Sequence, residues 1–141
     1  MAYEAQGFDI GTLTAASDLN DSTDQYVFVK QTSGTVFAVT AAITDVVLGI
    51  LQDTPSSGKA GLIRIAGISK LRFSSTSHAA IAVGDKLGPS TETDGGADGS
   101  TKVGRYVAAR AMEALAANTT AIITVRLVSE GGGSTGTQAA P

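Results

Sequence analysis

VVLGILQDTPSSGKAGLIRIAGISKLRF, residues 46–73, contains two apolar runs on either side of a Pro-Ser-Ser-Gly turn. This arrangement predicts a strand, a turn and a second strand. In the second run, Ile63 and Ile65 flank Arg64, and basic and apolar side chains alternate again up to Phe73. A period of two is typical of a strand with one face in the core and one face in water. We therefore expect this segment to form the centre of a small β domain.

A second unit of the same kind lies at residues 103–127. Its first part, VGRYV at 103–107, has a glycine inside an apolar run, as the first unit does, and a polar break follows. In the strand after the break, three apolar side chains share one face and two polar ones share the other: Ile123, Val125 and Leu127 against Thr124 and Arg126. Two such units favour a closed or nearly closed barrel, because closure protects strand edges. We predict an all-β fold, a small β-barrel or β-sandwich-like domain.

The length of 141 residues allows one domain that buries roughly two-thirds of its unfolded surface. Because only 5% of the residues are aromatic, the expected single core consists mainly of Val, Ile and Leu. Residues 1–24 place a few hydrophobic side chains among Gly, Thr, Ser and Asp, which predicts an extended N-terminal arm. The domain is expected at 25–128, followed by a flexible Gly-rich tail at 129–141.

Within the domain, the β-forming residues at 25–31 and 35–40 are joined by Thr-Ser-Gly, which predicts a hairpin. The polar, Gly-rich segment 91–101 is expected to be an exposed loop. Residues 108–118 have helical propensity, yet they continue an apolar run. We favour a strand to about Ala111 and then a turn or one helical turn; a helix over the whole segment is the alternative.

Charge and composition exclude several classes of partner. A net charge of −3 argues against binding to a phosphate backbone, which needs a clustered positive field, so no nucleic-acid partner is expected. Without cysteine, the chain has neither disulfides nor thiolate zinc sites. Residues 1–7 lack a basic region followed by an apolar one, so we expect no secretory signal. Since no apolar run approaches the ~20 residues of a membrane helix, no membrane partner is expected.

No set of residues in the sequence points to catalysis. His78 is the only histidine, has no carboxylate close to it in sequence, and is interpreted as a loop residue. Asp94 and Asp98 lie in a Gly-rich loop but miss the spacing of a calcium loop. Lys70 and Arg72 share a strand face that either meets an acidic partner or, as we favour, is solvated. We predict that the protein is not an enzyme and has no catalytic, metal or cofactor site.

The chain resembles the capsid decoration (cement) proteins of tailed bacteriophages. Five segments at 25–128 carry the resemblance, in the order VLGIL, GLIRIAGI, AIAVGDKL, KVGRYVA and IITVRL. The chain is also similar, more distantly, to the lambda-type head decoration protein. The resemblance implies a β-rich domain with an extended arm, usually a homotrimer, on the outer surface of the expanded capsid. Its partner would be the major capsid protein, and the protein would be made in the host cytoplasm.

The N-terminal arm either docks on a partner or only touches its own domain. If it docks, it would add a strand to a sheet of the capsid protein, so that main-chain hydrogen bonds give affinity. From the arm's own pattern we expect four side chains to contact the capsid: Tyr3, Phe8, Ile10 and Leu13. Deletion of residues 2–20 is then expected to abolish capsid binding and leave the domain folded.

Two other functions are compatible with the sequence. A tail or fibre component would assemble with itself into tubes or shafts instead of binding finished shells. A carbohydrate-binding β module usually has an aromatic platform, and this chain has only three Tyr, four Phe and no Trp to build one.

Overall fold

The computed structural model describes residues 7–73, 78–90, 97–99 and 106–128. These residues form ten strands and no helix, which confirms the all-β prediction. The first five are β1 (Gly7–Ile10), β2 (Thr14–Ala15), β3 (Phe28–Gln31), β4 (Val36–Val39) and β5 (Gly49–Leu51). The others are β6 (Ile63–Phe73), β7 (Lys86–Pro89), β8 (Ala97–Gly99), β9 (Ala109–Ala111) and β10 (Ala121–Leu127).

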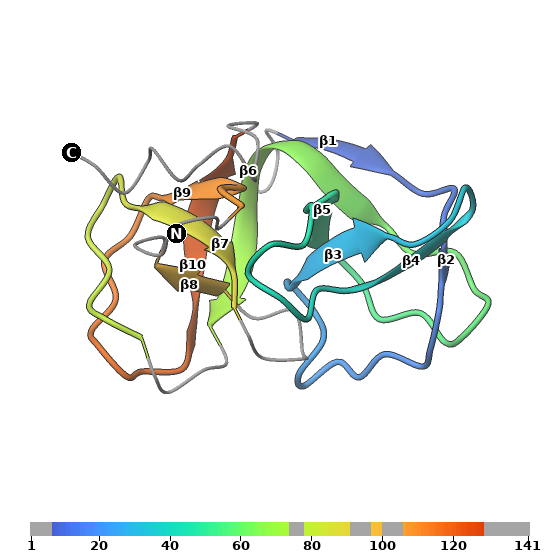
Figure 1. The fold of residues 1–141 in the computed structure, drawn as a ribbon, viewed down its shortest axis with the longest axis horizontal. Coiled ribbons are helices and arrows are strands. Elements are labelled where there is room, and N and C mark those ends of the chain that lie inside the picture. The colour runs from blue at the N-terminus through green and yellow to red at the C-terminus, as the bar shows by residue number, and fades with distance from the viewer. Residues whose placement is uncertain (1–6, 74–77, 91–96, 100–105, 129–141) are drawn as a thin grey trace.

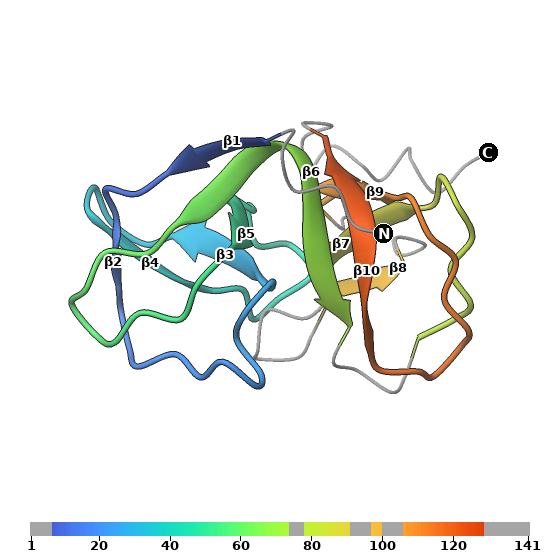
Figure 2. The same ribbon diagram turned by 180° about the vertical axis from the view of Figure 1, so that it is seen from behind.

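The 11-residue strand β6 belongs to both halves of the molecule (Figure 1 and Figure 2). Its first part pairs with β5 on one side and β1 on the other, and its second part, from Ile68 onward, pairs with β10. Gly67 lies between the two parts with a φ of 92°. Such a backbone angle is accessible to glycine and strained for other residues, so the strand changes direction here. We call β1–β5 with the first part of β6 the first lobe, and β7–β10 with the second part of β6 the second lobe.

In the first lobe, the strand order is β2-β4-β3-β5-β6, with β1 on the far side of β6. The antiparallel pair of β3 and β4 confirms the hairpin predicted at 25–31 and 35–40, and the antiparallel pair of β5 and β6 confirms the strand, turn and strand predicted at 46–73. Gly49 in β5 explains the glycine inside the apolar run, because a Cβ there would collide with the backbone carbonyl of Arg64. One core cluster lies in this lobe: Leu13, Ala15, Val29, Phe37, Leu51 and Ile63.

In the second lobe, the strand order is β6-β10-β9-β7-β8. β9 ends at Ala111, and no helix follows it within residues 108–118, so the favoured strand-and-turn prediction is confirmed. Of the predicted exposed loop at 91–101, the described residues 97–99 instead form β8 against β7. The second core cluster includes Leu71, Phe73, Leu87, Ile123 and Val125, and extends to Phe28 and Ile50 of the first lobe.

Two clusters therefore replace the single core that we expected. The reason lies in β3 and β5, whose adjacent residues point to opposite faces. Val29 and Leu51 enter the first cluster while Phe28 and Ile50 enter the second, and all four are fully buried. These two strands are buried on both faces, so they separate the clusters and join the lobes.

The basic residues of β6 are not simply on a wet face, as the alternating pattern indicated. Arg64 is only 8% exposed, because β1 lies along it. The ammonium of Lys70 lies 5.3 Å from the centre of the Tyr26 ring, and Arg72 Nε donates a hydrogen bond to Gln25 O at 3.0 Å. Both side chains are half-buried on the surface of their own domain.

Candidate functional site: the latched N-terminal arm

The N-terminal arm adds strand β1 to the side of β6 that β5 does not occupy. Phe8 lies opposite Ala66 and Ile10 opposite Ile63, with a β-bulge between Phe8 and Asp9. Among the described strands, β1 pairs with β6 alone, so its second edge is a free strand edge. A free edge can accept hydrogen bonds from a strand of another chain.

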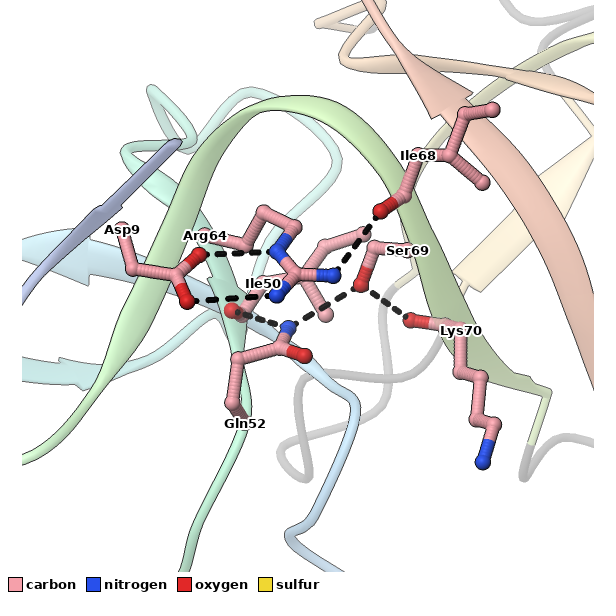
Figure 3. A network of polar contacts seen from close by, with 7 residues as sticks. All are labelled: Asp9, Ile50, Gln52, Arg64, Ile68, Ser69 and Lys70. Carbon is pink, nitrogen blue, oxygen red and sulfur yellow. Dashed lines mark hydrogen bonds and ion pairs between the residues drawn. The ribbon is translucent and has the colours of Figure 1, made fainter. Parts of the chain in front are cut away.

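An ion pair fastens this arm to the domain. Arg64 Nε donates to Asp9 Oδ1 at 2.7 Å, and Nη2 donates to Asp9 Oδ2 at 3.2 Å (Figure 3). Such a bidentate contact fixes direction as well as distance. Gly7 supports the contact, because a Cβ at that position would collide with the Arg64 side chain. We call the Asp9–Arg64 pair the latch.

The latch also stabilises the bend of β6. Arg64 Nη1 donates to Ile68 O at 3.0 Å, so one guanidinium group contacts the strand on both sides of Gly67. Gln52 adds a second link, since its Nε2 donates to Ile50 O at 2.9 Å and to Ser69 Oγ at 3.0 Å (Figure 3). The arm, the bend and β5 therefore share one polar network.

The four predicted arm residues have different environments. Phe8 is 64% exposed on β1. Ile10 packs against the first core cluster, and Leu13 is a buried member of it. Tyr3 lies outside the described residues. Deletion of residues 2–20 would remove Leu13 and Ala15 from the core, so this deletion does not test binding apart from folding; whether the four residues contact a capsid stays a prediction.

His78 is buried in the second lobe, at 4% exposure, although it lies in a loop as expected. Its Nδ1 is 2.8 Å from Ala79 O and its Nε2 is 2.8 Å from Thr119 O. The ring centre lies 5.2 Å from that of Phe73. Both oxygens are backbone carbonyl oxygens, so the histidine lies between its own loop and the loop at Thr119 and has a structural environment.

Two carboxylates have lowered pKa values because backbone groups donate to them. Burial by itself raises the pKa of Asp45, but hydrogen bonds from the Ala41 and Ala42 N–H groups and from the Lys30 ammonium outweigh it. Hydrogen bonds from the side chain and backbone N–H of Thr124 lower the pKa of Glu113. Each carboxylate therefore holds a turn or a strand through these hydrogen bonds.

Within the part of the chain that the structure describes, no three His, Asp or Glu side chains gather as metal ligands would. Asp94 lies outside the described residues, and for Asp98 only the backbone in β8 is described. No described helix is long and apolar enough to cross a membrane.

No family model matches the sequence, and no curated protein does. A solved structure does match: the N base of head fiber gp8.5 in bacteriophage phi29. The TM-score is 0.58 at 15% sequence identity, and the alignment covers 89% of this chain and 98% of that one. The likeness establishes a shared fold.

Sequence reasoning missed the latch. A signal for it exists, because Arg64 stands between two isoleucines and Asp9 between Phe8 and Ile10, each a charge within an apolar alternation. A charged residue in such a position needs a partner when its strand is covered. The sequence does not indicate which acidic residue pairs with which basic one, because 55 residues separate the two.

Proposed function

We propose that this protein is a structural component of a tailed-phage virion, a decoration protein that binds the major capsid protein on the outer surface of the head. The observation that carries the proposal is the fold, which matches a phage head-fiber base over nearly the whole of that chain. The resemblance of segments at 25–128 to decoration proteins supports the same assignment.

The arm supplies a physical means of attachment. β1 presents an edge with which no other described strand pairs and to which a strand of the capsid protein can add, and the exposed Phe8 lies on this strand. The latch holds β1 in place before contact, which reduces the conformational entropy lost on binding. In a homotrimer, three such arms would bind adjacent capsid subunits together, so that weak single contacts give strong attachment.

A second candidate is the base of a head fibre, which the description of the phi29 structure favours. A decoration protein and a fibre base would both bind the shell. A fibre base would in addition carry a further shaft segment or partner chain, and fewer copies would bind per shell.

Cosedimentation with purified expanded shells that lack the protein tests both candidates. We expect saturable binding, with about one copy per major capsid protein for a decoration protein made of trimers at three-fold positions. A much lower saturating ratio would favour the fibre base. No binding to shells would contradict both.

A matched pair of variants tests the role of the arm. Phe8→Ser should weaken shell binding by about tenfold or more, because an exposed aromatic residue at an interface often contributes much of the binding energy. Val46→Ser, which alters an equally exposed apolar residue near β5, should change binding by less than about twofold. Equal binding by wild type and Phe8→Ser would show that attachment uses another surface.

A further inference from the structure

A surface pocket of about 300 Å³ lies where β6 ends and β10 begins. The described residues that line it come from three segments: the end of β6 with Arg72, residues 120–122, and the loop before β3 with Ser22 and Thr23. In the antiparallel register Ile122 lies opposite Arg72, so the two side chains point to the same face of the sheet. Ile122 is 41% exposed, which places an apolar surface beside the guanidinium group. We call this site the Arg72 pocket.

Two backbone carbonyl groups of the loop before β3 hold Arg72 in position. Its Nε donates to Gln25 O at 3.0 Å, and its backbone N–H donates to Tyr26 O at 2.7 Å. Because the guanidinium group is planar, the bond from Nε also sets the direction of its other N–H groups. A group that is already oriented loses less side-chain entropy when it binds an anion.

The loop that holds Arg72 contains a strained residue. Tyr26 has a φ of 64°, a left-handed backbone conformation that is uncommon for a bulky side chain. Its N–H donates to Leu51 O at 2.9 Å and its own carbonyl accepts from Arg72, so hydrogen bonds on both sides impose this conformation. Backbone strain of this kind is concentrated at functional sites, including those that hold ligands. The strain is therefore a second indication, independent of the pocket, that this loop is shaped for binding.

Hydroxyl groups supply the other polar atoms of the pocket, on Ser22, Thr23 and Thr120. The Ser22 hydroxyl donates to Asn20 Oδ1 at 2.7 Å, and its oxygen can still accept a hydrogen bond. A ligand with several hydroxyl groups matches this set, and the C–H face of a sugar ring can pack on Ile122. Ligand pockets have volumes of about 300–1,000 Å³, so this one suits a single ring-sized unit.

We propose that the Arg72 pocket binds one carboxylate-bearing sugar, a uronic acid unit of an acidic polysaccharide. The carboxylate would pair with the guanidinium group through charge-assisted hydrogen bonds, and the sugar hydroxyls would bond to those of the pocket. Recognition by charge takes the place of the aromatic platform that carbohydrate-binding modules usually have. A polyphosphate fits less well, because Asp21 and Asp24 belong to the same loop and repel each added negative charge.

The pocket and the arm use different parts of β6. β1 pairs with residues 63–67 near the start of this strand, and the Arg72 pocket lies at its end (Figure 2). The sugar site goes beyond the proposed attachment to a shell and does not depend on it. A protein that fails to bind shells would still bind the sugar.

Two small sugars test the site by amide NMR on the full chain without shells. Methyl glucuronide should shift the signals of residues 22–23 and 120–122 in a saturable way. Methyl glucoside, which has a hydroxymethyl group in place of the carboxylate, should bind at least about tenfold more weakly. Equal binding of the two sugars, or no binding of the glucuronide, would overturn the proposal.

Two variants that each remove one positive charge locate the site. Arg72→Gln should weaken glucuronide binding by about tenfold or more, because the pocket loses its guanidinium group. Arg126→Gln, at an exposed position further along β10, should change binding by less than about twofold. Equal effects would mean that the sugar senses only overall charge, which would also overturn the proposal.

Thr120→Asp tests the pocket without altering the hydrogen bonds that hold Arg72. The added carboxylate should repel that of the sugar and weaken binding by about tenfold or more, with the rest of the amide spectrum unchanged. Unchanged binding would place the sugar elsewhere and contradict the proposal. Displacement of the glucuronide by an equal concentration of inorganic phosphate or of the peptide Gly-Glu-Gly would indicate a general anion site or a peptide site, and would overturn it too.

Discussion

Asp45 fixes a turn to a strand through a single carboxylate. Its Oδ2 accepts from Ala41 N–H at 2.7 Å and from the Lys30 ammonium at 2.9 Å. The turn at 41–45 is thereby held against β3, which lies between the two core clusters. Because the donors favour the ionised form, the pKa of Asp45 in the folded protein lies below its ordinary value of 3.8.

The lowered pKa of Asp45 makes stability depend on pH. The ionised carboxylate contributes stability above the unfolded-state pKa, and this contribution is lost as pH falls through the lower folded-state pKa. Asp45→Asn should therefore lower the free energy of unfolding at neutral pH by about 0.5–1 kcal/mol, a modest amount because Lys30 is partly exposed. As pH falls below the ordinary value of 3.8, the difference between variant and wild type should shrink.

Urea unfolding at neutral and acidic pH measures this difference. Asp21→Asn, at an exposed loop position, serves as the control and should leave the urea midpoint unchanged at neutral pH. If the difference in unfolding free energy between Asp45→Asn and wild type stayed constant into the acid range, the ionised Asp45 carboxylate would not be the source of the stability.

At the scale of elements, the arm depends on the latch. Asp9→Asn would leave the buried guanidinium of Arg64 without its carboxylate partner, which should cost about 1.5–3 kcal/mol. The loss should appear first in β1, so amide hydrogen exchange should speed up at residues 7–10 before it does in β3 or β10.

The double variant Asp9→Asn with Arg64→Met tests whether the two residues act together. If they do, the double variant should cost less than the sum of the single ones, because the buried charge of Arg64 is removed together with the carboxylate that pairs with it. Additive effects, or unchanged exchange in β1, would show that the ion pair does not hold the arm.

The bend in β6 depends on Gly67. Alanine at a φ of 92° is strained, so Gly67→Ala should destabilise the protein by about 1–3 kcal/mol. Gly34→Ala in the hairpin turn is the matched control, because a Cβ there meets nothing within 4 Å. It should shift stability by no more than about 0.5 kcal/mol, as thermal unfolding can measure. Equal Tm values for the two variants would mean that β6 bends without help from the glycine.

Strands with a clear local pattern could be predicted from the sequence, and pairings between distant strands could not. The hairpin of β3 and β4 follows from a short turn and β-forming residues. β1 was expected as an arm, yet its place beside β6 depends on the Asp9–Arg64 contact, which no local pattern specifies. The bend at Gly67 could not be predicted, because the residue fits a regular strand by sequence and its positive φ angle is known only from the structure.

At the scale of the whole molecule, the same limit explains why a single core was expected where two core clusters occur. Alternation predicts that a strand has one buried face, and β3 and β5 have two. The candidate surfaces also depend on this arrangement. β1 and its latch, for example, belong to the first lobe alone.

The lobes should nevertheless unfold together. β6 supplies Ile63 to the first core cluster and Leu71 and Phe73 to the second, and β3 and β5 are buried between the clusters. Leu51 and Leu87 are fully buried leucines, one in each cluster, and they form a matched pair of sites. Either Leu→Ala change should cost about 2–5 kcal/mol.

If the lobes form one cooperative unit, Leu51→Ala and Leu87→Ala should each shift the same single transition, as seen by calorimetry and by circular dichroism. Two separate transitions, with each variant lowering only one of them, would show that the lobes fold independently. In that case the shared strand would be a linker between two small domains. A single transition would mean instead that a ligand bound at either lobe stabilises the whole chain by mass action.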